Sequence, residues 1–372
     1  MDSAWRGWIL RDVVVPFALT RAALLVVVFI AATSLPSGVA CAPCDLSSHP
    51  LLNGLTRWDG GAYVAIARDG YTYAPGEQST IAFAPLLPLL MRALATPFLS
   101  AGDDSLIAAG LLVTNAALLV ALGYLVALGR DIRDDASGRR AALYLLVFPT
   151  TIFLSALYAE SLFLALGLAA IVEARHGRWG RAGVLAGLAA LARPFGLLLV
   201  VPLLIERIGR RGQSRGLDVG TVALALPLAA FVAWQLWLYR LTGDLFAFVS
   251  AQTAYRRAPS APWAGIADLF DPAAYGDPWL VIAVLATATA LVLASWRVLP
   301  RSLAAYGSVM LLATVSSGTL VSFPRYALAL FPIFLALGAL AHRPAVHVPY
   351  IVVSTAAAAL FTAMFAAWFW VA

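Results

Sequence analysis

The sequence contains no lysine and little charge of either sign. All 25 basic residues are arginine, and charged residues make up 12% of the 372 residues, against 62% hydrophobic. Soluble domains carry about 25% charged and 45–50% apolar residues, so this composition excludes an ordinary soluble protein. The absence of lysine, together with abundant alanine, glycine and leucine, is typical of a GC-rich genome and points to a bacterium.

Cysteine and histidine are also scarce. The two cysteines, Cys41 and Cys44, lie three positions apart, and the four histidines are dispersed. A thioredoxin-like site needs a βαβ context, which is absent, so the pair is interpreted as a small disulfide in an external loop or as two idle thiols. No group of His, Cys and carboxylate residues has the spacing of a metal site. We therefore predict no cofactor and no obligatory divalent metal.

Long apolar runs fill most of the chain. Runs such as residues 106–128, 219–238, 279–296 and 348–372 approach or exceed the ~20 residues that cross a ~30 Å hydrocarbon core. The fold class is therefore an all-α, polytopic transmembrane helical bundle. Residues 13–35 are too long for the apolar part of a signal peptide, and we interpret them as a retained first span. Within it, Arg21 snorkels to the interface or faces protein.

Arginines gather in the short connections between the apolar runs. Under the positive-inside rule these connections are cytoplasmic, so the net charge of +6 reflects topology and does not indicate a nucleic-acid partner. This predicts a cytoplasmic N-terminus, roughly eleven passes and two external loops, residues 37–105 and 241–278. We predict a single membrane domain over residues 1–372, in the plasma membrane. We expect residues 81–99 of the first loop to lie along the interface or to dip into it.

The segment between Arg181 and Arg207 allows two interpretations. Its roughly 25 residues suffice for one crossing, which would place one arginine cluster outside. The alternative is a pair of short helices that ends near Arg193, where Pro194 and Gly196 permit the chain to reverse. We favour the reversal, although a single crossing stays open at this point.

Charged residues near the external face are the candidates for chemistry, because charge inside a bilayer costs about 2.5–3.5 kcal/mol per residue. Each also has a structural interpretation. External arginines can bind lipid phosphates, Glu160 can stabilise a helix N-terminus, and Asp59 can belong to an ordinary turn. The predicted topology gathers two carboxylates and several arginines on one side of the membrane: Asp59, Glu160, Arg193, Arg256, Arg257 and Arg325.

Five segments, in the same order, resemble the PIG-V family, the GPI mannosyltransferase II enzymes and their bacterial relatives. They are residues 57–63 (RWDGGAY), 82–88 (AFAPLLP), 155–163 (SALYAESLF), 193–196 (RPFG) and 323–326 (FPRY). The resemblance covers nearly the whole chain, which makes it more specific than one motif. Ala84 departs from the family pattern, where a phenylalanine is expected, and this concerns packing. The short set of loops leaves the acceptor open.

The resemblance implies a function. Members of this family are similar to GT-C glycosyltransferases, which take a sugar from a polyprenyl-phosphate donor on the outer or luminal face with inversion. It implies mannose from polyprenyl-phosphate-mannose as the donor substrate, a glycolipid or glycan as acceptor, and membrane lipids as further partners. It carries the role of catalytic base onto Asp59.

The chemistry of the residues agrees with this. A phosphate monoester has a second pKa of about 6 and leaves readily, so one carboxylate that takes the acceptor proton suffices. Guanidinium groups match phosphate oxygens. The predicted site comprises the catalytic Asp59 and Glu160, with Glu160 orienting an arginine or the acceptor sugar; the phosphate-binding Arg57, Arg193, Arg256 and Arg325; and the substrate contacts Trp58, Tyr63, Tyr158, Gln252 and Tyr255.

Three alternatives to this function are open. The same architecture serves another polyprenyl-phosphate sugar, such as glucose or arabinose. A flippase or transporter of lipid-linked sugars would carry ionisable residues near the midplane, whereas the charges here gather on one face. A non-catalytic subunit of a membrane complex would tolerate replacement of Asp59 by asparagine.

Overall fold

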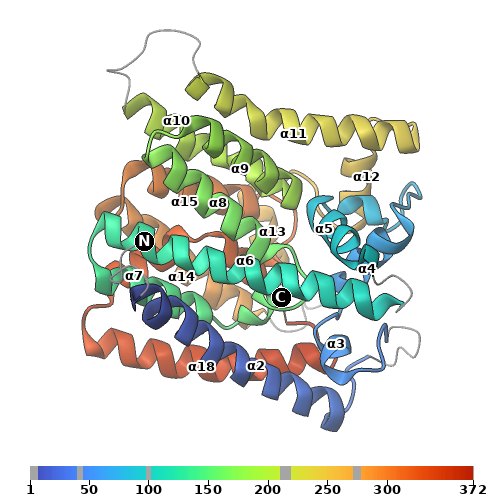
Figure 1. Ribbon diagram of the computed structural model, residues 1–372, viewed down its shortest axis with the longest axis horizontal. Helices are drawn as coiled ribbons and strands as arrows, with labels where there is room; N and C mark the ends of the chain where they lie inside the picture. The colour runs from blue at the N-terminus through green and yellow to red at the C-terminus, as the bar shows by residue number, and fades with distance from the viewer. Residues whose placement is uncertain (1–6, 40–44, 98–101, 210–218, 271–277, 372) are drawn as a thin grey trace. The chain divides into compact units, whose positions relative to one another are not determined.

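The computed structural model describes residues 7–39, 45–97, 102–209, 219–270 and 278–371 (Figure 1). This part of the chain is helical and contains no strand, as predicted. Contacts divide it into two compact units: unit 1 holds residues 1–70, 87–165 and 337–371, and unit 2 holds residues 71–86 and 166–336. The single domain over residues 1–372 stays a prediction. Cys41 and Cys44 lie outside the described residues, so both interpretations of that pair stay open.

Unit 1 combines helices from the two ends of the chain with most of the segment predicted as the first external loop and with the helices that follow it. Helix α5 begins in unit 2, α8 begins in unit 1, and α17 ends in unit 1. The elements of unit 1 are η1 (Leu10–Val14), α2 (Val15–Ser34), α3 (Pro50–Gly54), α4 (Asp59–Asp69), α5 (Leu86–Ala95), α6 (Asp103–Ile132), α7 (Asp135–Leu146), η5 (Thr151–Leu154) and α18 (Pro344–Ala366).

Unit 2 contains the middle of the chain. Several of its elements are short and follow one another at sharp breaks. They are η3 (Thr80–Ala82), α8 (Glu160–Arg175), α9 (Trp179–Ala192), η6 (Pro194–Leu199), α10 (Val200–Gly209), α11 (Val219–Thr242), α12 (Ala247–Ala254), α13 (Pro262–Asp268), α14 (Trp279–Val298), α15 (Arg301–Val315), α16 (Phe323–Tyr326), η7 (Ala327–Ala329) and α17 (Pro332–Leu340).

Among the described residues, five helices are long and apolar enough to cross a membrane. A sixth span exists if the pair on either side of a 76° bend, Phe323–Ala329 and Pro332–Leu340, is one broken crossing. This confirms a helical membrane protein, whereas the number of passes, roughly eleven on the positive-inside rule, stays a prediction. The five helices are Gly7–Ser34, Asp103–Ile132, Gly220–Thr242, Trp279–Val298 and Pro344–Ala366.

Helices α6 and α7 of unit 1 form a tight antiparallel pair. Asp134 begins α7 as an N-cap, and its carboxylate accepts a hydrogen bond from the N–H of Ser137 at 2.6 Å. This bond lowers the pKa of Asp134. A Cβ atom at Gly138 would lie 2.5 Å from the carbonyl oxygen of Val126, so glycine permits the close approach of the two helices.

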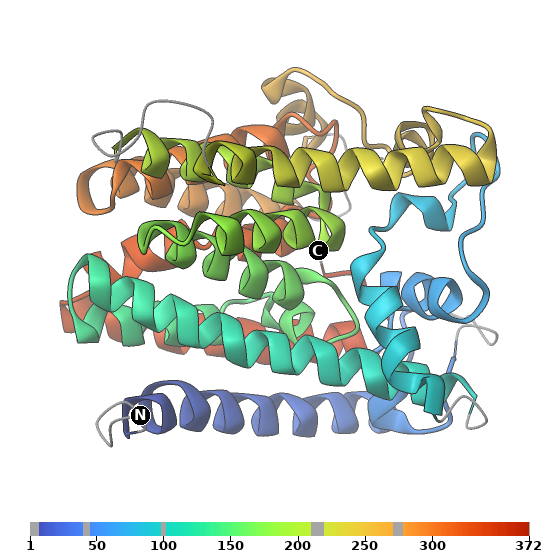
Figure 2. The same cartoon turned by 45° about the horizontal axis from the view of Figure 1, so that its top comes forward.

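Arg21 faces protein, which decides between the two sequence alternatives. It lies on α2, which runs beside α18 (Figures 1 and 2), and it is 6% exposed. Its guanidinium donates to the carbonyl oxygen of Leu146 at 2.9 Å and to the hydroxyl of Ser155 at 3.0 Å. These bonds satisfy backbone and side chains of the segment between α7 and α8, where helical hydrogen bonding is broken. Arg21 thereby fixes the segment that precedes Glu160.

The break at Arg193 turns the chain back on itself. A Cβ atom at Gly196 would overlap the backbone of Ala189 and Ala190, so η6 lies directly against α9. This geometry supports the reversal that we favoured over a single crossing. Helix α9 also packs against α11 (Figures 1 and 2), where a Cβ atom at Gly183 would lie 2.8 Å from Ala223. Small residues allow such close helix pairs in membranes.

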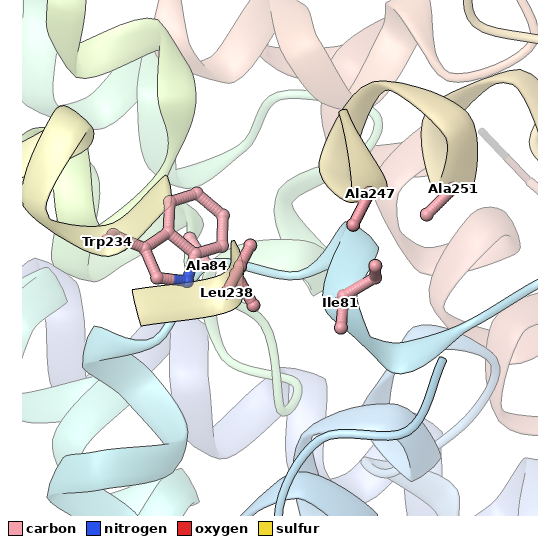
Figure 3. Close-up of a cluster of buried hydrophobic side chains, with 6 residues drawn as sticks. All are labelled: Ile81, Ala84, Trp234, Leu238, Ala247 and Ala251. Carbon is pink, nitrogen blue, oxygen red and sulfur yellow. The ribbon is translucent and has the colours of Figure 1, made fainter. Parts of the chain in front are cut away.

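The segment after Gly70 forms part of the core of unit 2. Its short helix η3 packs against α11 and α12, and Ala84 lies beside the ring of Trp234 (Figure 3). Ala84 is therefore a packing position, as its departure from the family pattern implies. The buried cluster consists of Ile81, Ala84, Trp234, Leu238, Ala247 and Ala251.

Candidate functional site

Asp59 is the first residue of α4 and follows a strained residue. Trp58 has φ 58° and ψ −118°, a conformation that costs a non-glycine residue about 1–3 kcal/mol and persists only when its surroundings impose it. Tyr158, which is 1% exposed, imposes it. Its hydroxyl donates to the carbonyl oxygen of Arg57 at 3.1 Å and accepts from the N–H of Asp59 at 3.2 Å. The backbone on both sides of Trp58 is thereby fixed.

The turn before α4 also packs directly on the segment that carries Tyr158. The N–H of Leu157 donates to the carbonyl oxygen of Leu55 at 2.9 Å. A Cβ atom at Gly60 would lie 3.3 Å from Thr56 and 3.6 Å from Leu157, so a larger residue at position 60 would push the two segments apart. The glycine after Asp59 is thus explained by close packing.

Arg57, predicted to bind the donor phosphate, is committed to protein groups. Its Nη1 donates to Asp45 Oδ1 at 2.7 Å and its Nε donates to the carbonyl oxygen of Ala366 at 3.1 Å. The guanidinium also lies 4.6 Å from the centroid of the Trp368 ring, and the residue is 5% exposed. This geometry does not support a phosphate contact, and it makes Arg57 a positioning residue for the Asp59 turn.

Asp45 anchors this arrangement as an anion. The hydrogen bond from Asn53 Nδ2, 2.6 Å long, lowers the pKa of Asp45, and Arg57 adds to the effect against an opposing contribution from partial burial. Asp45 could not be identified from the sequence, because an isolated loop aspartate resembles any other.

Trp58 lies in an aromatic cluster of unit 1. Its ring meets Trp368 at 5.5 Å and Trp370 at 5.2 Å between centroids, both edge-to-face. Tyr63 lies one turn further along α4 and is 7% exposed. Of the aromatic residues predicted to contact substrate, Tyr158 and Tyr63 are buried, and Tyr158 supports the turn through its hydroxyl. Neither of the two C-terminal tryptophans was predicted.

Glu160 is the first residue of α8 and is 1% exposed. The segment before it is bound to α6: Thr114 Oγ1 donates to the carbonyl oxygen of Tyr158 at 3.3 Å, and Asn115 Nδ2 donates to that of Ser155 at 3.1 Å. Glu160 therefore has the helix-terminal position of the structural interpretation. Both predicted carboxylates belong to unit 1, and each begins a helix.

Unit 2 contains a cluster of arginines around one aromatic ring. The guanidinium carbons of Arg193, Arg325 and Arg257 lie 5.0, 5.3 and 5.7 Å from the centroid of the Tyr326 ring. Arg193 comes from the break between α9 and η6, and Arg325 belongs to α16 and is 2% exposed. The ring favours each cation. Three positive charges around one ring favour an anion nearby.

Arg257, rather than the predicted Arg256, joins this cluster. Arg256 is exposed and adopts a positive φ of 59° in the turn that follows α12. The next side chain, Arg257, places Nη1 3.4 Å from Gln252 Oε1 and lies 5.7 Å from the Tyr255 ring. Gln252 in turn donates from Nε2 to the carbonyl oxygen of Ala82 at 2.8 Å. Gln252 and Tyr255 therefore support Arg257.

In the part of the chain that the structure describes, no group of three or more His, Cys, Asp or Glu side chains is placed to hold a metal ion. The metal independence of the protein stays a prediction. The predicted meeting of the carboxylates of unit 1 with the arginines of unit 2 likewise stays a prediction.

Comparison with known proteins agrees with the resemblance seen in the motifs. The family model described as mannosyltransferase (PIG-V) matches residues 18–211. The GPI alpha-1,6-mannosyltransferase 2 of Mus musculus is 34% identical over 175 residues, which are 44% of this chain and 33% of that enzyme. The Rattus norvegicus enzyme is 34% identical over 200 residues, 50% of this chain and 37% of that enzyme. The matched parts thus span little more than a third of these relatives.

Two solved structures share the fold. A crystal structure of ArnT from Cupriavidus metallidurans bound to undecaprenyl phosphate has a TM-score of 0.53 at 14% identity, over 94% of this chain and 76% of that chain. The archaeal oligosaccharyltransferase AglB from Archaeoglobus fulgidus, in complex with an inhibitory peptide and a dolichol-phosphate, has a TM-score of 0.51 at 14% identity, over 99% of this chain and 56% of that chain. The chain has the helical fold of these GT-C membrane proteins, and it belongs to the mannosyltransferase (PIG-V) family.

Proposed function

We propose that the protein transfers mannose from polyprenyl-phosphate-mannose to a hydroxyl group of a glycolipid or glycan, with inversion, on the non-cytoplasmic face of a bacterial plasma membrane. The observation that carries this proposal is the fixed turn at Asp59. In a chain of this family, a half-buried carboxylate begins a helix after a strained residue whose two neighbours are held by one buried hydroxyl. Strain of this kind clusters at active sites.

The relatives support the class of donor and the sugar. The curated relatives are named as alpha-1,6-mannosyltransferases, which supports mannose. The two structures of the same fold hold undecaprenyl phosphate and dolichol-phosphate, and both ligands are polyprenyl phosphates. A chain with this fold therefore has precedents for binding the carrier part of the proposed donor.

The reaction needs one base and a stabilised leaving group. The acceptor oxygen attacks C1 of the mannose from the side opposite the phosphate, the C1–O bond to the phosphate breaks, and the acceptor proton passes to Asp59. The pair of electrons from the broken bond stays on the phosphate, whose second pKa of about 6 makes it a good leaving group. No general acid is then needed, unlike in glycoside hydrolysis.

The arginine cluster of unit 2 supports the leaving-group role. We assign Arg193, Arg257 and Arg325 to the donor phosphate, because their guanidinium groups lie within 5.7 Å of the Tyr326 ring and bring three charges to one place. Planar guanidinium forks pair with phosphate oxygens in two-bond contacts. Glu160 orients an arginine or the acceptor sugar. The arginine-rich connections support the outward face, because the positive-inside rule assigns them to the cytoplasm.

The test compares transfer of label by purified protein in lipid nanodiscs. Wild type, Asp59→Asn and Asp69→Asn would each receive short-chain polyprenyl-phosphate-[¹⁴C]mannose and a membrane-lipid extract as acceptor pool. Asp69 is a matched control because it lies on the same helix α4, is exposed and pairs with Arg68. We expect transfer by wild type and Asp69→Asn, and a loss of about 10²–10⁴-fold in Asp59→Asn, the range of general-base contributions.

Two outcomes would contradict the proposal. An Asp59→Asn variant that transfers label at the wild-type rate would show that Asp59 is not the base. A wild-type protein that neither transfers nor hydrolyses the mannose donor, but transfers glucose or arabinose from the corresponding donors, would show that the sugar is wrong.

A further inference from the structure

Unit 1 contains a polar cavity whose lining residues precede the Asp59 turn in the sequence. Its volume is about 460 Å³, within the usual range of about 300–1,000 Å³ for small-molecule sites. Arg57 belongs to its wall and precedes Asp59 by two residues, so the wall and the proposed base share one short segment of chain. The residues that matter for recognition are Asp45, Ser47, Ser48, Asn53 and Arg57.

One wall of the cavity holds an unsatisfied hydrogen-bond acceptor. Asn53 is 9% exposed, and its Nδ2 donates to Asp45 Oδ1 at 2.6 Å. Its Oδ1 is buried and has no hydrogen-bond partner among the described residues. A buried polar atom without a partner costs about 1–3 kcal/mol, so a native fold normally satisfies it with a ligand or water. In this cavity the partner must be a hydrogen-bond donor.

The charge balance of the cavity excludes an anion. Arg57 and Asp45 form an ion pair of 2.7 Å, which cancels the positive charge of the guanidinium. The Asp45 side chain is 56% exposed, so its carboxylate would repel a phosphate. The wall therefore offers a carboxylate, an amide oxygen and the hydroxyls of Ser47 and Ser48. A ring with several hydroxyl groups matches acceptors of this kind, since each hydroxyl can donate one hydrogen bond.

We propose that this cavity binds a sugar or cyclitol ring of the acceptor, and that Asn53 and Asp45 accept hydrogen bonds from its hydroxyls. The assignment of this ring to the acceptor rests on the proposed glycosyl transfer, because the ring then lies beside the chain segment that carries the base. The donor phosphate, by contrast, is assigned to the arginines of unit 2. Different residues would therefore bind the acceptor ring and the donor phosphate.

A binding test that needs no catalysis uses a reporter cysteine. In a background with Cys41→Ser and Cys44→Ser, the variant Ser48→Cys is labelled with a membrane-impermeant maleimide in nanodiscs. Methyl α-D-mannopyranoside, myo-inositol, glycerol or inorganic phosphate is added as probe. We expect mannoside or inositol to slow labelling severalfold, and glycerol and phosphate to have no effect. Thr96→Cys, an exposed position outside the cavity wall, serves as control.

A kinetic test then assigns the ring to the acceptor. The variant Ser48→Trp would fill the cavity from an exposed position without disturbing the buried Asn53, and Thr96→Trp is its matched control. We expect Ser48→Trp to raise KM for the acceptor pool at least about tenfold, which corresponds to about 1.4 kcal/mol, with KM for the donor unchanged. Thr96→Trp should match wild type in both constants.

The outcomes separate this inference from the proposed function. The sugar site would be overturned if phosphate, rather than mannoside or inositol, slowed the labelling of Ser48→Cys. It would also be overturned if none of the probes slowed it. Both outcomes hold whether or not the protein transfers mannose. A rise in KM for the donor alone would overturn the acceptor assignment while transfer itself stands. If wild type transfers no sugar, the proposed function fails, and the labelling test still decides what the cavity binds.

Discussion

At the scale of single residues, the site depends on one hydroxyl group. Tyr158 holds the carbonyl of Arg57 and the N–H of Asp59, which are the peptide groups on either side of the strained Trp58. Without it, α4 could begin with a relaxed residue at position 58, and the Asp59 carboxylate would lose its fixed direction. Catalytic groups must be held within about 0.5 Å of the productive position, so relaxation of this turn affects the rate more than binding.

The variant Tyr158→Phe tests this role. It keeps the ring but removes the hydroxyl, and release of about 1–3 kcal/mol of strain corresponds to a fall in kcat of roughly 5–150-fold. We expect KM for the donor to stay unchanged in a transfer assay. Tyr306→Phe is the control, because that hydroxyl is also buried and lies 3.5 Å from the carbonyl oxygen of Ala329 in unit 2. A Tyr158→Phe protein with wild-type kcat would show that the hydroxyl does not position Asp59.

At the scale of elements, short helices joined by sharp breaks place the charged groups. Helix α9 has 14 residues and is about 21 Å long, shorter than a hydrocarbon core of ~30 Å. The chain turns back after it through η6, and Arg193 is the residue at the turn. The position of this guanidinium near Tyr326 therefore depends on how closely η6 lies against α9.

The variant Gly196→Ala tests the turn. Its Cβ atom would overlap the backbone of Ala189 and Ala190, so η6 must move away from α9. Overpacking of this kind costs about 1–3 kcal/mol, and we expect a lower thermal unfolding midpoint together with a higher KM for the donor, because Arg193 moves. In Gly209→Ala the added Cβ atom meets nothing within 4 Å, so it is the control. Equal midpoints and equal donor KM values for the two variants would contradict the packing of η6 on α9.

At the scale of the whole molecule, the features that could be predicted are those that depend on composition and on the order of the motifs. The apolar runs identified the long helices because lipid requires about 20 apolar residues per crossing. The motifs also selected Arg193 and Arg325, which the structure brings together around Tyr326. Arg257 could not be chosen over Arg256, because a single turn with a positive φ decides which of two adjacent arginines faces the ring.

Contacts between distant parts of the chain could not be predicted from the sequence, because they depend on the tertiary fold. The pairing of Arg57 with the carbonyl of Ala366 joins residues 309 positions apart, and no local pattern encodes it. Its ion pair with Asp45 depends on how the segment from Asp45 to Arg57 folds. From the sequence alone, Arg57 was predicted to be available for the donor phosphate. In the tertiary structure its guanidinium binds Asp45 and the carbonyl of Ala366 instead.

The number of passes is the remaining question at this scale, and the chain reversal at Arg193 makes a definite prediction for it. If the chain turns back there, Arg181 and Gly209 lie on the same side of the membrane, and the positive-inside rule makes that side cytoplasmic. Single cysteines at these two positions, in a background without Cys41 and Cys44, would be labelled by an impermeant maleimide in inside-out vesicles only. A cysteine in place of the exposed Glu77, in the loop predicted to be external, should react in right-side-out vesicles only. Labelling of positions 181 and 209 from opposite sides would mean a single crossing. One arginine-rich connection would then face outward, and the active face that we propose for Asp59 would need a new argument.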